Sequence, residues 1–467
     1  MPVILIAACA ELGISILNNS ALPIYFTKGL HIPTGTYSLL MIPFFISEVL
    51  FKSPLGVLAD KIGRKPLMLG GAMVTVFTPL FFITIHYDYL AATAVITLLT
   101  FGFLRALDGL GQAALWPSLY AYVGDVVAEN KRGAAMGSLN VVYMIGIAFS
   151  FLVGGFVDDN FGPIFAKQAT FAGQFTRFSA RVHARVHAIG PHLHHALHPH
   201  SAILPPAVVI PPVPHYDFRP EYYYPSFILT SVLFAVAVLA ALAVRGKARK
   251  LDTHPDQAAD KTSEETMTWE GFLAALKTVP QFLALAFVTF LGIGCIALLV
   301  KKFALDEYGM TETRFGLLVL GPALAIALVA VPAGHLADTW GKTRCVRLGF
   351  TLCTVGLWGI PILHHLHAGI NGFMVSAGVL GVGFVLAFPA WLALLTELGG
   401  ERQRGTVFAA VSTAQGLGML LGASVSGYIY SGLGHIAPFV AASILVSLGT
   451  ALALIFVRDS RLRLSTP

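Results

Sequence analysis

Long apolar segments recur along the whole chain, and they constrain its fold more than any other feature. A helix needs about 20 mainly apolar residues to cross the hydrocarbon core of a bilayer. Twelve segments meet this requirement, so we predict an all-α membrane protein with twelve transmembrane helices. They are expected at 3–26, 36–59, 66–86, 90–121, 134–156, 224–245, 278–300, 314–337, 344–365, 370–396, 405–429 and 435–457.

Charged residues make up only 12% of the 467 residues, about half of the roughly 25% found in soluble domains. So little charge excludes a soluble enzyme, because a soluble globule of this size needs a polar surface. The net charge of +6 comes from short basic runs between apolar segments, which argues against a nucleic-acid partner. The sequence also holds no phosphate-binding loop and no catalytic constellation. We expect no enzyme activity, no cofactor and no metal site.

The basic residues are distributed unevenly between the loops on the two sides of the predicted spans. Each even-numbered span ends on a Lys/Arg cluster, whereas the short loops at 87–89, 366–369 and 431–434 have neither residue. The positive-inside rule then places both termini in the cytoplasm of a multi-pass protein of the inner or plasma membrane. Lys301, Lys302 and Arg314 are exceptions, because they flank the loop after span seven.

Two polar segments divide the chain. Residues 157–223 are predicted to form a long external loop rich in His and Pro, and 245–269 a cytoplasmic linker. The N-terminal six-helix bundle then comprises 1–156 and 224–244, and the C-terminal bundle comprises 270–467. His183 and His187 have an i,i+4 spacing that can bind metal on a helix. We favour a polar loop without a metal, since other ligand types are scarce there, and a surface helix resting on the membrane is an alternative.

A nine-residue pattern occurs once in each half. GVLADKIGR ends span two and GHLADTWGK ends span eight, and both read G-x-L-A-D-x-x-G-[RK]. The same motif at the same place predicts two bundles related by a parallel internal repeat.

At these residues the chain resembles the major facilitator superfamily, whose best-known motif is this loop between spans two and three. Arg105, Gly109 and Gly111 are similar to that family's span-four pattern R-x-x-x-G-x-G. The resemblance covers almost the whole chain except 157–223, and it implies a secondary transporter. A third pattern, typical of exporters, is partly kept: Gly137, Gly146, Gly154 and Gly155 are present, but Ser150-Phe151 replaces its Gly-Pro. This favours export and leaves antiport open.

The resemblance implies a gate at the repeated motif. Its candidate residues are Gly56, Asp60, Gly63, Arg64, Lys65, Asp338 and Gly341. A carboxylate such as Asp60, if it faces a helix N-terminus, gains up to about 2 kcal/mol, and its loss on opening would bias two states. The alternative is a charged loop that only sets topology.

Ionisable residues within spans are candidates for proton coupling, because a charge at membrane depth costs at least ~2.5–3.5 kcal/mol. Glu48 and Lys52 share a helix face in span two, as do Arg105 and Asp108 in span four. We propose Glu48, Arg105 and Asp108 as coupling candidates. Each pair has the alternative role of holding the bundle together, which we favour for Asp108. Glu11 lies near the start of span one and is expected to be shallow.

Polar and aromatic side chains within other spans are candidates for a substrate cavity: Asn18, Asn19, Trp116, Phe388, Trp391 and Gln415. The alternative role is packing or bridging between helices. The function we expect is proton-coupled efflux of small, partly apolar compounds by alternating access, with the lipid bilayer and the cargo as partners of a monomer. An importer of a sugar or organic acid, and a non-transporting sensor that docks partners through 157–223, are the alternatives.

Overall fold

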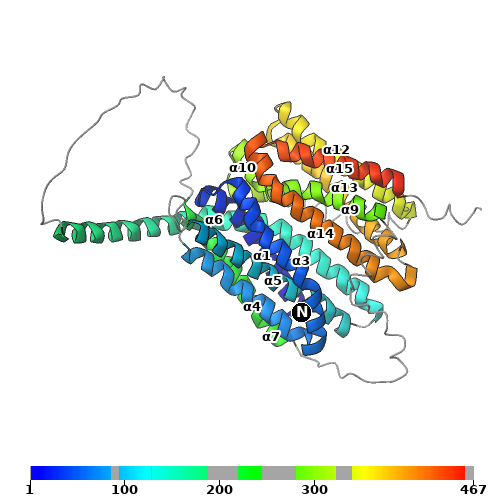
Figure 1. Ribbon diagram of the computed structural model, residues 1–467, viewed down its shortest axis with the longest axis horizontal. Helices are drawn as coiled ribbons and strands as arrows, with labels where there is room; N and C mark the ends of the chain where they lie inside the picture. Colours follow the sequence, from blue (N-terminus) through cyan, green and yellow to red (C-terminus); the bar gives the residue numbers. More distant parts are fainter. Residues whose placement is uncertain are drawn as a thin grey trace, which may run out of the picture.

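The computed structural model describes residues 2–85, 94–127, 129–187, 219–244, 280–321, 339–398 and 400–457. Every regular element within these ranges is helical, and the helices gather in two bundles (Figure 1). Each bundle is built from one half of the chain. This confirms the predicted all-α membrane fold.

The N-terminal bundle begins with a span that changes helix type along its length. Its elements are α1 (Pro2–Ser15), the π-helix η1 (Ile16–Ala21), α2 (Leu22–Ile24), the π-helix η2 (Tyr25–Gly29), α3 (Thr34–Ile62), α4 (Arg64–Thr84), α5 (Ala94–Val126), α6 (Glu129–His187), the 3₁₀ helix η3 (Pro220–Tyr223) and α7 (Tyr224–Ala243).

The C-terminal bundle contains α9 (Pro280–Ala297), α10 (Val300–Tyr308), α12 (Lys342–His365), α13 (Gly369–Leu398), α14 (Gly400–Leu433) and α15 (Ala437–Phe456). A further helix covers 312–321. Ten of the described helical segments are long and apolar enough to cross a membrane. Of the two other expected spans, 405–429 lies within α14, and most of 314–337 lies outside the described residues.

The segment 157–223 differs from the predicted loop, because α6 continues as one helix to His187. It extends beyond the two bundles (Figure 1). Residues 164–187 contain several Ala, Gln and Arg residues, which favour helix, and the loop prediction counted only their polarity. Residues 188–218 and the predicted linker at 245–269 lie outside the described residues.

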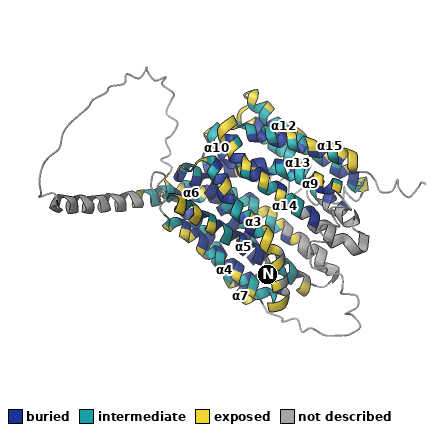
Figure 2. Cartoon of the chain, in the orientation of Figure 1, coloured by how far each residue is buried: buried dark blue, intermediate teal, exposed yellow. Residues whose placement is uncertain are grey.

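The outward faces of the helices are apolar. Leu99 and Leu239 are 68% and 65% exposed, and many other large aliphatic and aromatic residues are exposed as well. Exposed positions recur along the helices of both bundles (Figure 2). Such a surface is unfavourable in water and is the surface that lipid tails contact. The polar side chains Arg105, Asp108, Asp158 and Lys301 are buried instead.

The two ends of the molecule are distinguished by their turns. We call the end that holds Gly63 and Gly341 the motif end, and the end that holds α10 the α10 end. Gly63 and Gly341 have φ values of +99° and +97°, and each immediately precedes a helix, α4 and α12. Because a positive φ strongly favours glycine, the repeated glycine has the same backbone role in both halves.

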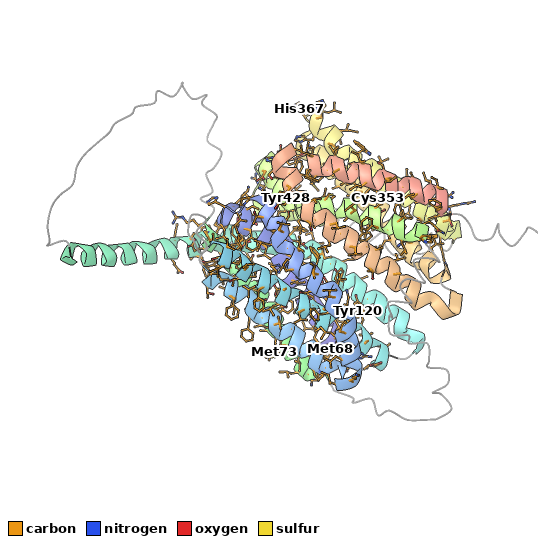
Figure 3. All side chains as sticks on the ribbon, viewed as in Figure 1. Met68, Met73, Tyr120, Cys353, His367 and Tyr428 are labelled. Atoms are coloured by element: carbon orange, nitrogen blue, oxygen red, sulfur yellow. The ribbon has the colours of Figure 1, made fainter. Side chains whose placement is uncertain are left out.

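The two halves meet tightly at the α10 end. On α14, a Cβ at Gly427 would lie 2.1 Å from the carbonyl oxygen of Thr34 on α3. A turn further along α3, the Ser38 and Ser426 hydroxyl oxygens are 3.3 Å apart. Tyr428 of α14 packs over Gly35 at the same contact (Figure 3). This conformation is therefore closed at the α10 end.

Candidate functional site

The π-helix η1 positions the polar residues of the first span. Pro23 cannot donate a backbone hydrogen bond to the carbonyl of Asn19, so the regular helix is interrupted there. The wider turns of η1 carry Asn18, Asn19 and Ser20. Asn18 is directed toward α5 and Ser20 toward the other half, as the contacts below show. Insertions of π-helix occur frequently at functional sites.

Arg105 on α5 is the centre of a buried polar network. Its guanidinium donates to Asp108 Oδ2 at 2.7 Å and to Asn18 Oδ1 at 2.7 Å. Thr78 of α4 donates to the other oxygen of Asp108. The Arg105 guanidinium also lies 4.5 Å from the centre of the Phe44 ring, in cation–π contact. The predicted pairing of Arg105 and Asp108 is present, and Asn18 joins it.

Trp116 belongs to a second, separate set of hydrogen bonds between α5 and α4. Its indole N–H donates to Gln112 at 3.2 Å, and Gln112 donates to Thr75 at 3.3 Å. The Trp116 ring packs against Tyr120 and Tyr143. These contacts favour the packing role of Trp116, because its polar atom already has a partner inside the bundle. Asn19 is only partly buried.

The other three predicted cavity residues come together. Phe388, Trp391 and Gln415 line one cavity of ≈ 310 Å³ within the C-terminal bundle. Its described walls come from α9, α12, α13, α14 and α15 and are mainly apolar; Cys353 marks its position in Figure 3. Thr289 adds a buried hydroxyl that has no hydrogen-bond partner among the described residues. Neither Asn18 nor Trp116 is among the lining residues of the described part.

Glu48 and Lys52 pair on α3 as their spacing predicts, with 3.3 Å between Nζ and Oε1. Both are more accessible than the Arg105 network, since their side chains are 28% and 54% exposed. Glu11 of α1 is buried inside the bundle and accepts a hydrogen bond from Ser15. Gly146 of α6 allows this, since a Cβ there would lie 2.7 Å from the Glu11 side chain.

At the motif end, the basic gate residues contact their own half. Lys65 donates to the carbonyl oxygens of Leu242 and Val244 at 2.7 and 2.8 Å, which caps the C-terminal end of α7. The Arg64 Nε atom lies 3.4 Å from Asp125 Oδ2 on α5. Gly56 has open space around its Cα among the described atoms. The side chain of Asp60 and the whole of Asp338 lie outside what the structure describes.

At the α10 end, the structure reveals a charge cluster that was not predicted. Lys301 of α10 donates to the Ser20 carbonyl at 2.7 Å, to the Ser20 hydroxyl at 2.8 Å and to Glu312. Lys301 and Glu312 are buried, and so is Asp158 of α6. The signal available in the sequence was the exception of Lys301 to the positive-inside rule. Asp158 gave no signal, because span five was expected to end at residue 156.

A second charge cluster joins the halves near the first. Asp306 of α10 binds Lys302 at 2.6 Å and Lys28 of η2 at 2.9 Å, and it accepts a hydrogen bond from Tyr430. Burial alone would raise the pKa of Asp306. The Lys302 and Lys28 ammonium groups outweigh burial and hold that pKa below its usual range. The Lys28 contact thus ties the N-terminal half to α10.

The fold and these sites define a polytopic membrane protein of two related halves that meet around buried polar groups. The family model of the Major Facilitator Superfamily matches residues 3–174 and 282–467. The chain belongs to the major facilitator superfamily.

Among curated proteins, the Quinolone resistance protein NorA of Staphylococcus aureus is 25% identical over 175 residues, which cover 38% of this chain and 44% of that protein. The match thus spans less than half the length of that relative. The Multidrug resistance protein 2 of Bacillus subtilis is 21% identical over 438 residues, covering 92% of this chain and 88% of that protein.

Solved structures share the fold at low sequence identity. A crystal structure of a D-xylose-proton symporter has a TM-score of 0.68 and 11% identity, covering 98% of this chain and 97% of that one. The nucleoside transporter NupG has a TM-score of 0.61 and 10% identity, with 98% and 99% covered. These likenesses support the twelve-helix, two-bundle arrangement.

Proposed function

We propose that this transporter exports small, partly apolar compounds in exchange for protons. The observation that carries the proposal is the ≈ 310 Å³ cavity that Phe388, Trp391 and Gln415 line. Ligand sites of this kind are mainly apolar, with a few polar groups that fix orientation. Thr289 and Gln415 supply such groups here. The names of the two curated relatives, which concern quinolone and multidrug resistance, point to the same class of cargo.

The sidedness of the proposal comes from the positive-inside rule. The motif end carries Lys61, Arg64 and Lys65, and it is therefore the cytoplasmic end, with both termini on that side. The α10 end is then the outer end. The structure, closed at the α10 end, corresponds to a state closed toward the outside. Opening that end and closing the motif end would complete alternating access at the midplane.

Proton coupling is assigned first to the charges within the spans of the N-terminal half. Glu48 is the candidate carrier, because it is partly accessible and its single described ion-pair partner, Lys52, is exposed. Asp108 is held by Arg105 and Thr78 at both oxygens, so we assign it the role of positioning Arg105. Asp60 and Asp338 remain the gate candidates at the motif end, together with the glycines of the two motifs.

Uptake of a sugar or organic acid is the second candidate, and the shared fold with a D-xylose-proton symporter favours testing it. The cavity argues for the first candidate. A sugar needs several hydrogen-bonding groups to replace its hydration, and the described cavity walls are predominantly apolar.

The test is transport of a fluorescent quinolone by cells or everted vesicles that contain the protein. We expect energy-dependent export by the wild type and loss of at least tenfold in Trp391→Ala, because truncation removes the largest side chain of the cavity wall. Trp358→Ala is the matched control, since Trp358 is in the same bundle but is not among the residues of the described cavity walls, and its indole N–H donates to Ser447 at 2.9 Å. Proton-driven accumulation of D-xylose without quinolone export would refute the proposal. Equal loss of quinolone export in both tryptophan variants would show that export does not depend on the cavity in particular.

A further inference from the structure

The buried cluster at the α10 end contains one more carboxyl group than it can neutralise. Lys301 uses all three ammonium hydrogens, two on Ser20 and one on Glu312. Its charge is therefore balanced by Glu312, and it has no hydrogen left for Asp158. The Asp158 carboxyl is fully buried beside this pair and interacts electrostatically with both members.

Asp158 and its neighbour Asp159 differ sharply in their surroundings. Asp159 accepts the backbone N–H of Thr313 at 2.8 Å and lies 3.4 Å from the Tyr222 hydroxyl. Within the described part of the chain, neither oxygen of Asp158 has a hydrogen bond of normal geometry. The Ser226 hydroxyl, which donates to the Gly154 carbonyl at 3.5 Å, lies close enough to Asp158 for a weak one. An ionised carboxylate left this way is far more costly than a neutral acid, and the adjacent Glu312 charge adds to the cost.

The cluster forms only when the halves close at the α10 end. Asp158 and Ser20 belong to the N-terminal half, and Lys301 and Glu312 to the C-terminal half. Gly155 makes the closure possible, since a Cβ there would lie 2.5 Å from the carbonyl oxygen of Glu312. When the halves separate at this end, water reaches Asp158. The ionised carboxylate is then hydrated, so Asp158 can lose its proton.

We propose that Asp158, Glu312 and Lys301 form a proton-binding site across the interface of the two halves, which holds one proton when the α10 end is closed. Four ionisable groups face this site: Lys301 of α10, Glu312 of the helix at 312–321, Asp159 of α6 and Tyr223 of η3. The proton resides on Asp158, with Glu312 neutralising Lys301. Closure of this end therefore takes up one proton, and opening releases it. The inference rests on the proposed alternating access, but it holds for any cargo and for either direction of transport.

The test measures closure directly, without substrate. Spin labels at Ile164 of α6 and Leu433 of α14, both exposed at the α10 end, report the distance between halves in lipid nanodiscs from pH 5.5 to 8. The four native cysteines are replaced in every variant, and every variant carries Glu48→Gln, so that the proposed proton carrier does not contribute to the pH dependence. We expect the ratio of closed to open molecules to fall as pH rises, by up to about tenfold per pH unit for one proton.

The number of buried carboxyl groups without a compensating cation predicts how steeply the closed-to-open ratio of each variant changes with pH. Asp158→Asn removes the surplus carboxyl, so the closed population should no longer depend on pH. Glu312→Gln should do the same, because Lys301 and Asp158 then neutralise each other, and this variant serves if the first one does not fold. Lys301→Gln leaves two carboxyl groups without a cation, so closure should take up two protons and shift to lower pH.

Asp159→Asn is the matched control and should keep the wild-type slope, since the amide oxygen still accepts from Thr313. A wild-type distance distribution that does not change with pH overturns the proposal. So does a pH dependence that survives in Asp158→Asn and Glu312→Gln, or that disappears only in Asp159→Asn. Failure of quinolone export would leave these distances unchanged, so the two proposals fail separately.

Discussion

Removal of the Arg105 side chain tests whether the buried network of α5 is an ion pair that the bundle needs. Arg105 and Asp108 are both 0% exposed, and Arg105→Met leaves the Asp108 charge with Thr78 alone. Breaking a buried pair by removing one partner costs about 3–5 kcal/mol, mainly through the uncompensated charge. Arg105→Met should therefore lower the free energy of unfolding by that amount.

The double variant Arg105→Met/Asp108→Asn removes the charge together with its partner. What remains is the loss of hydrogen bonds within the bundle, at about 0.6–1.7 kcal/mol each, so the double variant should cost about 1–3 kcal/mol. It should be more stable than the single variant by roughly 2 kcal/mol. Reversible unfolding in mixed detergent micelles measures all three proteins. Equal losses in the single and double variants would refute the ion-pair reasoning. Quinolone export by the double variant at the wild-type rate would show that Arg105 is purely structural.

Three further predictions concern other parts of the molecule. Gly155→Ala should open the α10 end, because its Cβ would lie 2.5 Å from the carbonyl oxygen of Glu312. Gly70→Ala should leave the spin-label distance unchanged, because no described atom lies within 4 Å of a Cβ there. Glu48→Gln should abolish pH-dependent transport while the protein stays folded, and unchanged gradient-driven transport would make Glu48 structural. The lowered pKa of Asp306 stabilises the fold fully above the ordinary aspartate pKa of about 3.9, and this contribution is lost as pH falls through the lowered value. Acid unfolding should show this loss in the wild type and lack it in Asp306→Asn.

The scarcity of charge made part of the site predictable. A lone Arg105 and Asp108 three residues apart in an apolar helix have few ways to satisfy their charges, so their pairing follows from local spacing. The role of the glycines in the repeated motif was also predictable from local sequence, but for a different reason. A loop that reverses direction between two spans needs a backbone conformation that glycine adopts most readily, and Gly63 and Gly341 adopt it.

The cluster at the α10 end could not be predicted in the same way. Lys301 and Ser20 are 281 residues apart, so their contact depends on how the two halves meet and not on any local pattern. Asp158 was hidden by the expected end of span five, because its polarity resembles that of a loop. Its burial becomes visible only when α6 is seen to continue and to pack, through Gly154 and Gly155, against Ser20 and Glu312.

Exchange of an apolar cargo for protons can be measured as proton movement in proteoliposomes. Vesicles that contain the purified protein, a pH-sensitive dye and a fluorescent quinolone are diluted into quinolone-free buffer with the membrane potential clamped. If the protein exchanges quinolone for protons, quinolone leaves and the lumen becomes more acidic, both faster than in protein-free vesicles. Quinolone efflux at the protein-free rate, or efflux accompanied by an alkaline shift of the lumen, would contradict this exchange.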